Sequence, residues 1–335
     1  MAGPCSAESE EQLLETARAL TACPNVSVFR AGLWKPRTRP GIFEGVGEAG
    51  LPWMRRVREE TSLLTTTEVA NARHVELCLE DGMSVLWIGA RTTANPFQVQ
   101  DIADALRGVD IPVLVKNPIV AEIGLWIGAI ERLDAAGLRR IAAVHRGFAT
   151  WKDSAYRYEP KWRIPIELQR MLPDLPILCD PSHIAGTREL VPQIARMALD
   201  LGIGGLMVES HIDPDSALSD AHQQITPAEL SVMLTSLQTR SPEITDPDAA
   251  ERIEVLRRRI TEADAAVLAA LAERKRWVGE IGSIKKEHEI AVLQMDRWKQ
   301  LLSDQTAEAE RLGLSTEFVK ALFEIMHAQA VKEQL

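Results

Sequence analysis

Short apolar runs alternate with amphipathic stretches along the first 240 residues of the chain. Each run is apolar on both faces, which is typical of a buried parallel strand. The runs lie at 26–32, 62–70, 84–91, 111–117, 140–147, 175–183 and 205–211. The stretches between them have helical periodicity, for example at 51–60, 71–81, 97–107, 121–136, 187–201 and 226–238. Strands that alternate with helices in this way indicate a parallel sheet.

An eighth strand is expected at the N-terminus, where "AGPCS" at 2–6 has the pattern of a strand end. Eight strand–helix units within about 240 residues predict an α/β fold of the (β/α)8 barrel type. A doubly wound open sheet is the alternative architecture. It is disfavoured because no glycine-rich dinucleotide fingerprint follows any of the runs.

The pattern changes near residue 240. A polar, proline-bearing stretch, "TRSPEITDPDA" at 239–249, has the composition of a linker, and no strand-like run follows it. Helical periodicity then extends over 250–287, 295–312 and 315–334. A helix of about 38 residues is about 57 Å long, which two short helices cannot bury, so we expect the helical domain to form a homodimer. The expected organisation is a barrel at 1–240, a linker at 241–249 and an all-α three-helix domain at 250–335.

Composition narrows the class of protein. The net charge of −10 argues against a nucleic-acid-binding protein, but it leaves room for a local basic pocket. The four cysteines have neither zinc-site nor disulfide-scaffold spacing, which favours free thiols in a reducing cytoplasm. The sequence also predicts no membrane span and no signal peptide, so we expect a cytoplasmic protein.

A polar or ionisable side chain follows each predicted strand. These residues are Cys5, Arg30, Glu68, Arg91, Lys116, Arg146, His183 and Glu209. In a barrel, the carboxyl ends of all the strands meet on one face, where active sites are built. Packing alone does not explain eight such residues in register, so we expect a site at this face.

Four of the residues near the strand ends form a candidate metal site: Cys5, His183, Glu209 and Asp220. A thiolate, an imidazole and two carboxylates suit a first-row divalent ion, namely Mn, Fe, Co or Zn, better than Mg or Ca. The alternative is that Cys5 is a small buried residue and His183 a hydrogen-bonded loop histidine. His211 and His222 are expected to support the site or lie on the surface rather than bind the ion.

A second set is cationic and includes Arg30, Lys35, Arg37, Arg91, Lys116 and Arg146. Arg binds phosphate and carboxylate groups through two hydrogen bonds, and Lys binds them as a point charge. Several cations together predict a substrate with more than one anionic group. The alternative, scattered surface cations, is weakened by "IPVLVKN", in which Lys116 ends a buried strand.

The motifs in this half of the chain resemble those of the 3-deoxy-D-arabino-heptulosonate 7-phosphate (DAHP) synthases. They are "AGPCSAES", "KPRTRPGIFEG", "WIGARTTANP", "LVKNP", "HRGF", "CDPSHIAG", "LMVESH" and "SDAHQQ". The resemblance covers about residues 2–238. It implies condensation of phosphoenolpyruvate with erythrose 4-phosphate, the first shikimate-pathway step of aromatic amino-acid biosynthesis. One departure is that only Met1 to Pro4 precede Cys5 where the family has a full first strand, so we expect a trimmed sequence or a stub strand.

The resemblance also implies roles for individual residues. Cys5, His183, Glu209 and Asp220 are the implied metal ligands. Mn is the expected metal, with Fe, Co or Zn as the alternatives. Phosphoenolpyruvate is held by Arg30, Lys35, Arg91, Lys116 and Arg146, and erythrose 4-phosphate by Lys35, Arg37 and Thr38. Lys35 is the expected proton donor to the forming hydroxyl group. A rival reading is the related synthase of an eight-carbon sugar acid, but "KPRT" favours the four-carbon aldose.

The helical domain resembles the all-helical chorismate mutases, which are intertwined dimers that convert chorismate to prephenate. The resemblance starts in "LRRRITEADAAVLAALAERKRWVGEIGSIK" at 256–285 and extends to residue 335. It implies that Arg257, Arg274 and Arg297 bind or orient the substrate and that Lys285 and Gln334 contact its ether oxygen. Arg274 and Lys285 lie within about 20° of one helix face, as a shared site requires.

Three positions of the helical domain depart from the mutase pattern. Gln294 and Trp298 replace acids that contact the chorismate hydroxyl group, and Ala330 replaces a serine. Two alternatives therefore remain: a charged coiled coil, or a non-catalytic dimerisation and ligand-sensing module. We also expect feedback control, in which prephenate or chorismate bound to the helices slows the barrel reaction.

Overall fold

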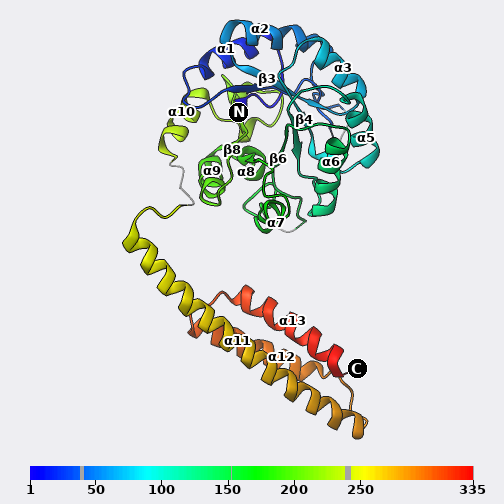
Figure 1. Cartoon of the computed structure of the whole chain (residues 1–335), viewed down its shortest axis with the longest axis vertical. Coiled ribbons are helices and arrows are strands. Elements are labelled where there is room, and N and C mark those ends of the chain that lie inside the picture. Colours follow the sequence, from blue (N-terminus) through cyan, green and yellow to red (C-terminus); the bar gives the residue numbers. More distant parts are fainter. Residues whose placement is uncertain (38–40, 152, 238–242, 335) are drawn as a thin grey trace. The chain divides into compact units, whose positions relative to one another are not determined.

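A computed structural model describes residues 1–37, 41–151, 153–237 and 243–334. The chain divides into two compact units, Met1–Pro242, called here the barrel unit, and Glu243–Leu335, called the helical unit. Strands and helices alternate in the barrel unit, and the helical unit is built from long helices (Figure 1). Thr38, an expected aldose-binding residue, lies outside the described residues.

All the strands of the barrel unit are parallel. Their order in the sheet is β8-β7-β6-β5-β4-β3-β2-β1-β9. Their bounds are β1 Ala2–Gly3, β2 Val28–Arg30, β3 Leu64–Val69, β4 Val85–Ile88, β5 Val113–Lys116, β6 Ile141–His145, β7 Ile177–Cys179, β8 Gly205–Leu206 and β9 Val208–Glu209. Apart from the last segment, each strand pairs with its neighbours in chain order, as in a (β/α)8 barrel.

The barrel closes within the last predicted strand, which the structure divides into two segments. β8 pairs with β7, whereas β9 pairs with β1, and only Met207 separates them. The Met207 amide donates to the Cys179 carbonyl at 2.8 Å, and the Val208 amide donates to the Met1 carbonyl at 3.0 Å. The strand therefore changes partner at one residue. The predicted barrel is confirmed, and the strand predicted at 205–211 is divided into the two segments β8 and β9.

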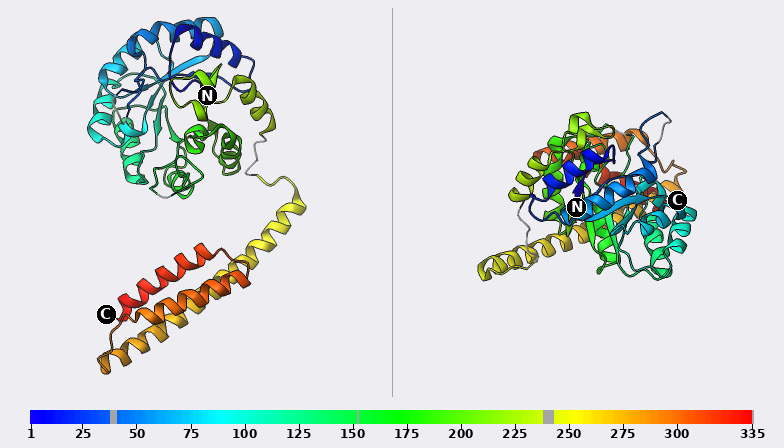
Figure 2. Two further views of the ribbon diagram at one scale, coloured as in Figure 1. Left: turned by 180° about the vertical axis from the view of Figure 1, so that it is seen from behind. Right: turned by 90° about the horizontal axis from the view of Figure 1, so that it is seen from above.

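Helices surround the strands of the barrel unit (Figure 2). They are α1 Glu10–Leu20, α2 Leu51–Thr61, α3 Ala72–Glu80, α4 Ala90–Thr93, α5 Pro96–Ala105, α6 Ile123–Ala135, α7 Arg163–Met171, α8 Pro181–Ala185, α9 Val191–Asp200 and α10 Pro227–Ser236. Several begin at a side chain that accepts a backbone N–H, as Ser9, Asn71 and Thr226 do. Apolar residues fill the space between sheet and helices, and Trp87 fills part of the barrel interior.

The helical unit consists of α11 Pro247–Glu287, α12 Met295–Arg311 and α13 Thr316–Gln334. α11 begins inside the stretch expected to be linker, because Asp246 accepts the amide of Asp248 and Pro247 occupies the first turn, where it needs no N–H partner. Among the described residues of this unit, only Val278, Ala309, Val319 and Ala330 are buried apolar residues. One copy of the unit therefore leaves most of its apolar surface exposed.

No helix in the described parts of the chain is long and apolar enough to cross a membrane. The longest, α11, carries charged residues along its whole length.

Candidate active site

The carboxyl ends of the parallel strands bring the predicted site residues to one rim of the barrel. Arg30 is the last residue of β2, Lys116 of β5 and Glu209 of β9. Arg146 follows β6 directly, and Cys5 lies two residues beyond β1. All five side chains are buried, although four of them are of the Arg, Lys and Glu types, whose charges burial disfavours without partners. Such residues are expected at a site and not in a packing core.

Three of the four expected metal ligands form a compact cluster. One ligand atom each from Cys5, Glu209 and Asp220 lies within 4.8 Å of the other two. The Cys5 thiol donates to Asp220 Oδ2 at 3.3 Å. Asp220 has a φ of 48°, a left-handed backbone conformation that aspartate adopts more readily than most residues other than glycine.

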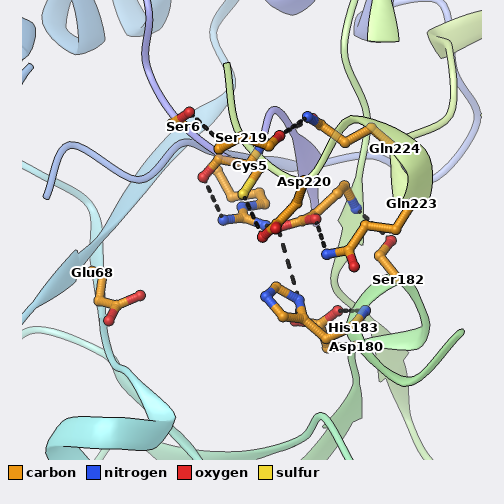
Figure 3. Close-up of polar contacts among 12 residues, drawn as sticks. Cys5, Ser6, Glu68, Asp180, Ser182, His183, Ser219, Asp220, Gln223 and Gln224 are labelled. Carbon is orange, nitrogen blue, oxygen red and sulfur yellow. Dashed lines mark hydrogen bonds and ion pairs between the residues drawn. The ribbon is translucent and has the colours of Figure 1, made fainter. Parts of the chain in front are cut away.

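The fourth expected ligand, His183, lies beside this cluster (Figure 3). It belongs to the short helix α8, and its Nδ1 is 2.9 Å from Asp180 Oδ2 and 3.8 Å from Glu209 Oε1. The imidazole is thus oriented by Asp180 and is not part of the tight cluster. Burial lowers the pKa of His183 in spite of these carboxylates, which favours the neutral imidazole that can bind a metal.

The donor set fits a first-row divalent ion. It combines one sulfur, two carboxylates and an adjacent neutral imidazole, all facing one point of the rim. Burial, followed by the charge of Glu209, raises the pKa of the Cys5 thiol to about 12. A metal ion would therefore displace a proton from this thiol on binding.

Cations lie directly against the cluster. Arg30 Nη1 is 2.8 Å from Glu209 Oε1, and both side chains are almost fully buried. Lys35 Nζ is 3.0 Å from Cys5 Sγ. Burial raises the pKa of Glu209, but His183, in its protonated form at low pH, and the Arg30 guanidinium outweigh burial and lower this pKa to about 2. Glu209 is therefore ionised over the whole physiological range.

A small polar cavity of about 70 Å³ opens beside the cluster. Ten polar or charged residues line it: Lys35, Arg37, Glu68, Arg91, Lys116, Arg146, Arg157, Tyr158, His183 and Asp220. Six of these are Lys or Arg, and only two are carboxylates. Since the chain as a whole is acidic, this excess of positive charge is local, and it suits an anionic ligand.

The expected cationic residues thus meet at one place. Lys35, Arg37, Arg91, Lys116 and Arg146 line the cavity, whereas Arg30 lies next to it against Glu209. Lys116 Nζ is 2.7 Å from Asp180 Oδ2, and it lies 5.6 Å from the centre of the Trp87 ring. Asp180 therefore holds both Lys116 and His183.

Sequence reasoning missed Arg157 and Tyr158. Arg157 Nη1 is 3.1 Å from Asp220 Oδ1, and the Arg146 guanidinium lies 3.5 Å from the centre of the Tyr158 ring. Both residues belong to the segment between β6 and α7, which has no helical or strand periodicity. Asp180 was also missed, although its position directly after β7 was a usable signal.

Two further histidines of this segment, His211 and His222, do not belong to the ligand cluster. His211 is buried, its Nε2 is 3.8 Å from Glu8 Oε2, and its Nδ1 accepts the amide of Asp213. His222 is exposed. These positions agree with the expectation that they support the site or lie on the surface.

The expected mutase residues are dispersed in a single copy of the helical unit. Arg274 donates to the Met326 carbonyl at 3.5 Å, and Lys285 donates to the Val292 carbonyl at 2.6 Å. Gln334 lies against Gly282 of α11. Arg257 is exposed and pairs with Glu254, and Arg297 is exposed on α12. Arg257 and Arg274 are 17 residues apart on α11, which is about 25 Å along the helix.

An aromatic pair lies in the same region. The Trp298 and His327 rings are stacked at 3.9 Å with an interplanar angle of 12°. Partial burial and the charges of Arg274 and Lys285 lower the pKa of His327. His327 was not expected from the sequence, and its stacking places it beside Trp298, one of the positions that depart from the mutase pattern.

Comparison with known sequences agrees with this division of the chain. A sequence model of the DAHP synthetase I family matches residues 1–245, and one of the chorismate mutase type II family matches residues 256–335. A Thermotoga maritima protein named phospho-2-dehydro-3-deoxyheptonate aldolase is 34% identical over 225 residues, which are 67% of this chain and 64% of that protein. The chain thus spans less than two thirds of that relative.

Two other similarities are informative. A Caulobacter vibrioides protein named 2-dehydro-3-deoxyphosphooctonate aldolase is 26% identical over 259 residues, covering 71% of this chain and 85% of that protein. Among solved structures, the crystal structure of the Thermotoga maritima DAHP synthase has a TM-score of 0.62 and 30% identity, and the match covers 70% of this chain and 66% of that one. The structural match agrees with the barrel observed here.

Proposed function

The chain belongs to the DAHP synthetase I family, and from this we propose that its barrel unit condenses phosphoenolpyruvate with erythrose 4-phosphate to DAHP. The observation that carries the proposal is the cluster of Cys5, Glu209 and Asp220 beside a cavity rich in cations. A metal-binding set next to an anion-binding set is what joining a phosphorylated enol to a phosphorylated aldehyde requires.

In this proposal the cations hold phosphoenolpyruvate. Lys116 and Arg146 are buried at the ends of β5 and β6, so their charges are fixed in place before the substrate arrives. Burial lowers the pKa of Arg146, yet Asp180 and Tyr158 support the charged form. Arg91 and Arg157, from other elements, complete a ring of donors around the phosphate and carboxylate groups. Fixed in this way, the methylene carbon of the enol phosphate can face the aldehyde.

Lys35 has the proposed catalytic role. Its ammonium group faces both the cavity and Cys5, within reach of an aldehyde oxygen held at the cluster. As the new carbon–carbon bond forms, Lys35 donates a proton to the developing alkoxide, which becomes the hydroxyl group. Water then adds to the cationic carbon, which still carries the phosphate oxygen, and gives one proton back to Lys35. The bond between this carbon and the phosphate oxygen breaks as the second proton passes to the leaving phosphate, which leaves the keto group of the product.

The proposed metal ligands are Cys5, Glu209 and Asp220, with His183 as the fourth. A bound divalent ion would supply Lewis-acid polarisation of the aldehyde oxygen. We propose Mn as this ion, with Fe, Co or Zn as the alternatives. The protein's own contribution is to keep the carboxylates ionised, through Arg30 at Glu209 and Arg157 at Asp220.

The second substrate separates two related activities. Arg37, whose Nε donates to the Phe43 carbonyl at 2.8 Å, lies at the cavity and is the proposed partner of the aldose phosphate. The eight-carbon sugar-acid synthase reading predicts arabinose 5-phosphate instead of erythrose 4-phosphate. We test the choice by incubating the full chain with phosphoenolpyruvate and each aldose and measuring phosphate release. Turnover with erythrose 4-phosphate alone is expected, and a preference for arabinose 5-phosphate would overturn the proposal.

We further propose that the helical unit converts chorismate to prephenate, since it matches the chorismate mutase type II family. Lys285 and Gln334 would contact the ether oxygen, and Arg257, Arg274 and Arg297 the carboxylates. The sensing alternative keeps the same cations but lacks turnover. Chorismate loss is measured with the full chain and with Lys285→Met. Turnover that Lys285→Met lacks supports the mutase, whereas binding without turnover in the unmodified protein supports only the sensor.

The helical unit is also the proposed site of homodimerisation. α11 exposes a row of apolar side chains that one copy leaves uncovered: Leu256, Ile260, Val267 and Ile281. Covering them with the same row of a second copy would remove this surface from water. It would also explain why Arg257 is far from the other predicted mutase residues, because it would serve the partner's site.

Feedback control is the last part of the proposal. The fusion of a first-step enzyme with a chorismate-binding unit motivates the idea that prephenate or chorismate slows the barrel reaction. The synthase rate is measured with and without prephenate in the full chain and in an Arg274→Ala variant. Inhibition that disappears in the variant is expected, whereas equal inhibition in both, or inhibition of neither, would contradict it.

A further inference from the structure

Gln224 joins two distant segments of the barrel rim. Its Nε2 donates to the Ser219 carbonyl at 2.8 Å, and its Oε1 accepts the Cys5 amide at 2.9 Å (Figure 3). The side chain is completely buried, and both ends of its amide group have a partner. A single side chain therefore fixes the backbone on either side of the ligand cluster.

The two segments carry different candidate ligands. Cys5 follows β1, whereas Ser219 precedes Asp220 in the segment after β9, and 215 residues separate Cys5 from Asp220 along the chain. Their side chains nevertheless meet at 3.3 Å. Asp220 itself has a left-handed backbone conformation, which is uncommon outside glycine, asparagine and aspartate.

Other contacts hold the same region, but none of them joins one backbone to another. Ser6 and Ser219 share a hydrogen bond between their hydroxyl groups, and the Glu8 carboxylate accepts the Leu218 amide at 2.8 Å. The neighbouring Gln223 donates to Glu209 Oε2 at 2.6 Å, on the opposite side of the cluster. Among these contacts, only that of Gln224 links the backbone of the Cys5 segment to the backbone of the Asp220 segment.

We propose that Gln224 is a positioning residue that sets the separation of the Cys5 thiol and the Asp220 carboxylate for metal binding. The inference rests on the metal site of the proposed function and deepens it. Contacts behind the metal ligands usually determine metal affinity by about 10–100-fold, because they fix the orientation of the ligands before the ion binds. Gln224 belongs neither to the ligand cluster nor to the lining of the cavity, so its role is distinct from that of the ligands.

Cobalt(II) alone is the probe, because a thiolate bound to Co²⁺ gives a near-ultraviolet charge-transfer absorption. The full chain, Gln224→Met and Cys5→Ala are titrated with Co²⁺ after chelation. Gln224→Met retains a similar side-chain length but makes neither hydrogen bond. We expect its Co²⁺ affinity to fall about 10–100-fold and its thiolate absorption per bound ion to decrease. Cys5→Ala provides the spectrum without the thiolate.

A matched control separates positioning from general stability. Ser84→Ala removes a hydrogen bond that the Ser84 hydroxyl group accepts from the Thr65 amide. Both residues lie at the amino-terminal ends of β4 and β3, and the ligands lie at the carboxyl ends of the strands. Ser84→Ala is expected to lower the unfolding temperature without changing the Co²⁺ spectrum. If Gln224→Met does not fold, Gln224→Asn, which keeps the amide but shortens the side chain, takes its place with the same two outcomes.

Two failures are distinguishable. If the unmodified protein shows no thiolate absorption with Co²⁺, the metal site of the proposed function is wrong, and this inference falls with it. If the unmodified protein shows the absorption and the Gln224 variant retains both affinity and spectrum, the positioning role alone is overturned. An affinity loss equal to that of Ser84→Ala would also overturn it.

Discussion

Lys35 Nζ lies 3.0 Å from Cys5 Sγ, so the proposed proton donor touches a proposed metal ligand. Lys35 is also hydrogen-bonded to the Cys5 carbonyl at 3.2 Å. Burial lowers the pKa of Lys35, but Cys5 in its thiolate form and the Glu209 carboxylate outweigh burial and raise this pKa. The ammonium group is therefore charged and held between the ligand cluster and the cavity, where it can serve both substrates.

Replacing Lys35 tests its catalytic role. Lys35→Met removes the charge but keeps the aliphatic stem, and we expect kcat for DAHP formation to fall by about 10²–10⁴-fold, as for the loss of a general acid. Lys161→Met, at an exposed position of the same unit, is the control and is expected to be unaffected. Co²⁺ affinity should not fall in Lys35→Met. If activity falls only as far as metal is lost, the proton-donor role is contradicted.

The buried pair of Arg30 and Glu209 supports a stability prediction. Arg30→Met leaves the Glu209 carboxylate buried without its main partner, and the free energy of unfolding should fall by about 3–5 kcal/mol. Arg56, which pairs with Glu60 on the exposed surface, is the matched arginine, and Arg56→Met should leave the free energy of unfolding nearly unchanged. Urea titration of the chelated full-length variants measures both, and equal losses would show that burial of the Arg30 pair is not the cause.

His145 supports a prediction on pH dependence. The residue is completely buried among Trp126, Phe148 and Trp162, and burial lowers its pKa from 6.5 to about 3. Below pH 6.5, the unfolded chain binds a proton at this residue that the folded barrel does not bind. The stability that neutral His145 gives the folded barrel is therefore fully present above pH 6.5, and it is lost as the pH falls from 6.5 towards 3.

The His145→Phe variant isolates this contribution. In the unmodified protein, the residue should account for a loss of about 2 kcal/mol in the free energy of unfolding between about pH 7 and pH 5. We expect His145→Phe to show a correspondingly weaker pH dependence in urea titrations. His222→Gln, at an exposed histidine, should retain the full dependence. Parallel pH profiles for the unmodified protein and His145→Phe would contradict the assignment.

The strand ends explain why much of the barrel site was predictable. A parallel barrel places every strand's carboxyl end on one rim, so a polar residue after an apolar run is a site candidate whatever its distance along the chain. Arg30, Lys116 and Glu209 were found in this way, and all are buried at that rim. The prediction needed only the period of the strands and their common direction.

Residues in irregular segments were not predictable in the same way. Arg157 and Tyr158 reach the cavity because Phe148 and Glu159 exchange backbone hydrogen bonds, at 2.8 Å each, and fold the segment after β6 back on itself. No periodicity marks that contact. The position of His183 likewise depends on Asp180, which caps α8 and orients the imidazole. Such tertiary contacts determine side-chain directions that the sequence pattern leaves open.

The apolar row of α11 predicts the effect of a charge on self-association. Ile260 is 59% exposed in one copy, and Ile260→Glu would place a carboxylate in the proposed dimer contact. We expect the mass measured by light scattering to shift from dimer to monomer, because burying an unpaired carboxylate is unfavourable. Arg258→Glu, about 160° away around the helix, should leave the dimer intact. A monomeric unmodified protein, or a dimer in both variants, would contradict the contact.

Metal dependence tests the central claim most directly. The full chain and Cys5→Ala are chelated, divided and assayed for DAHP formation from phosphoenolpyruvate and erythrose 4-phosphate, with and without added Mn²⁺. The account predicts that chelation abolishes the activity of the unmodified protein, that Mn²⁺ restores it, and that Cys5→Ala stays inactive in both conditions. Full activity of the chelated protein, or restoration of Cys5→Ala by Mn²⁺, would contradict it.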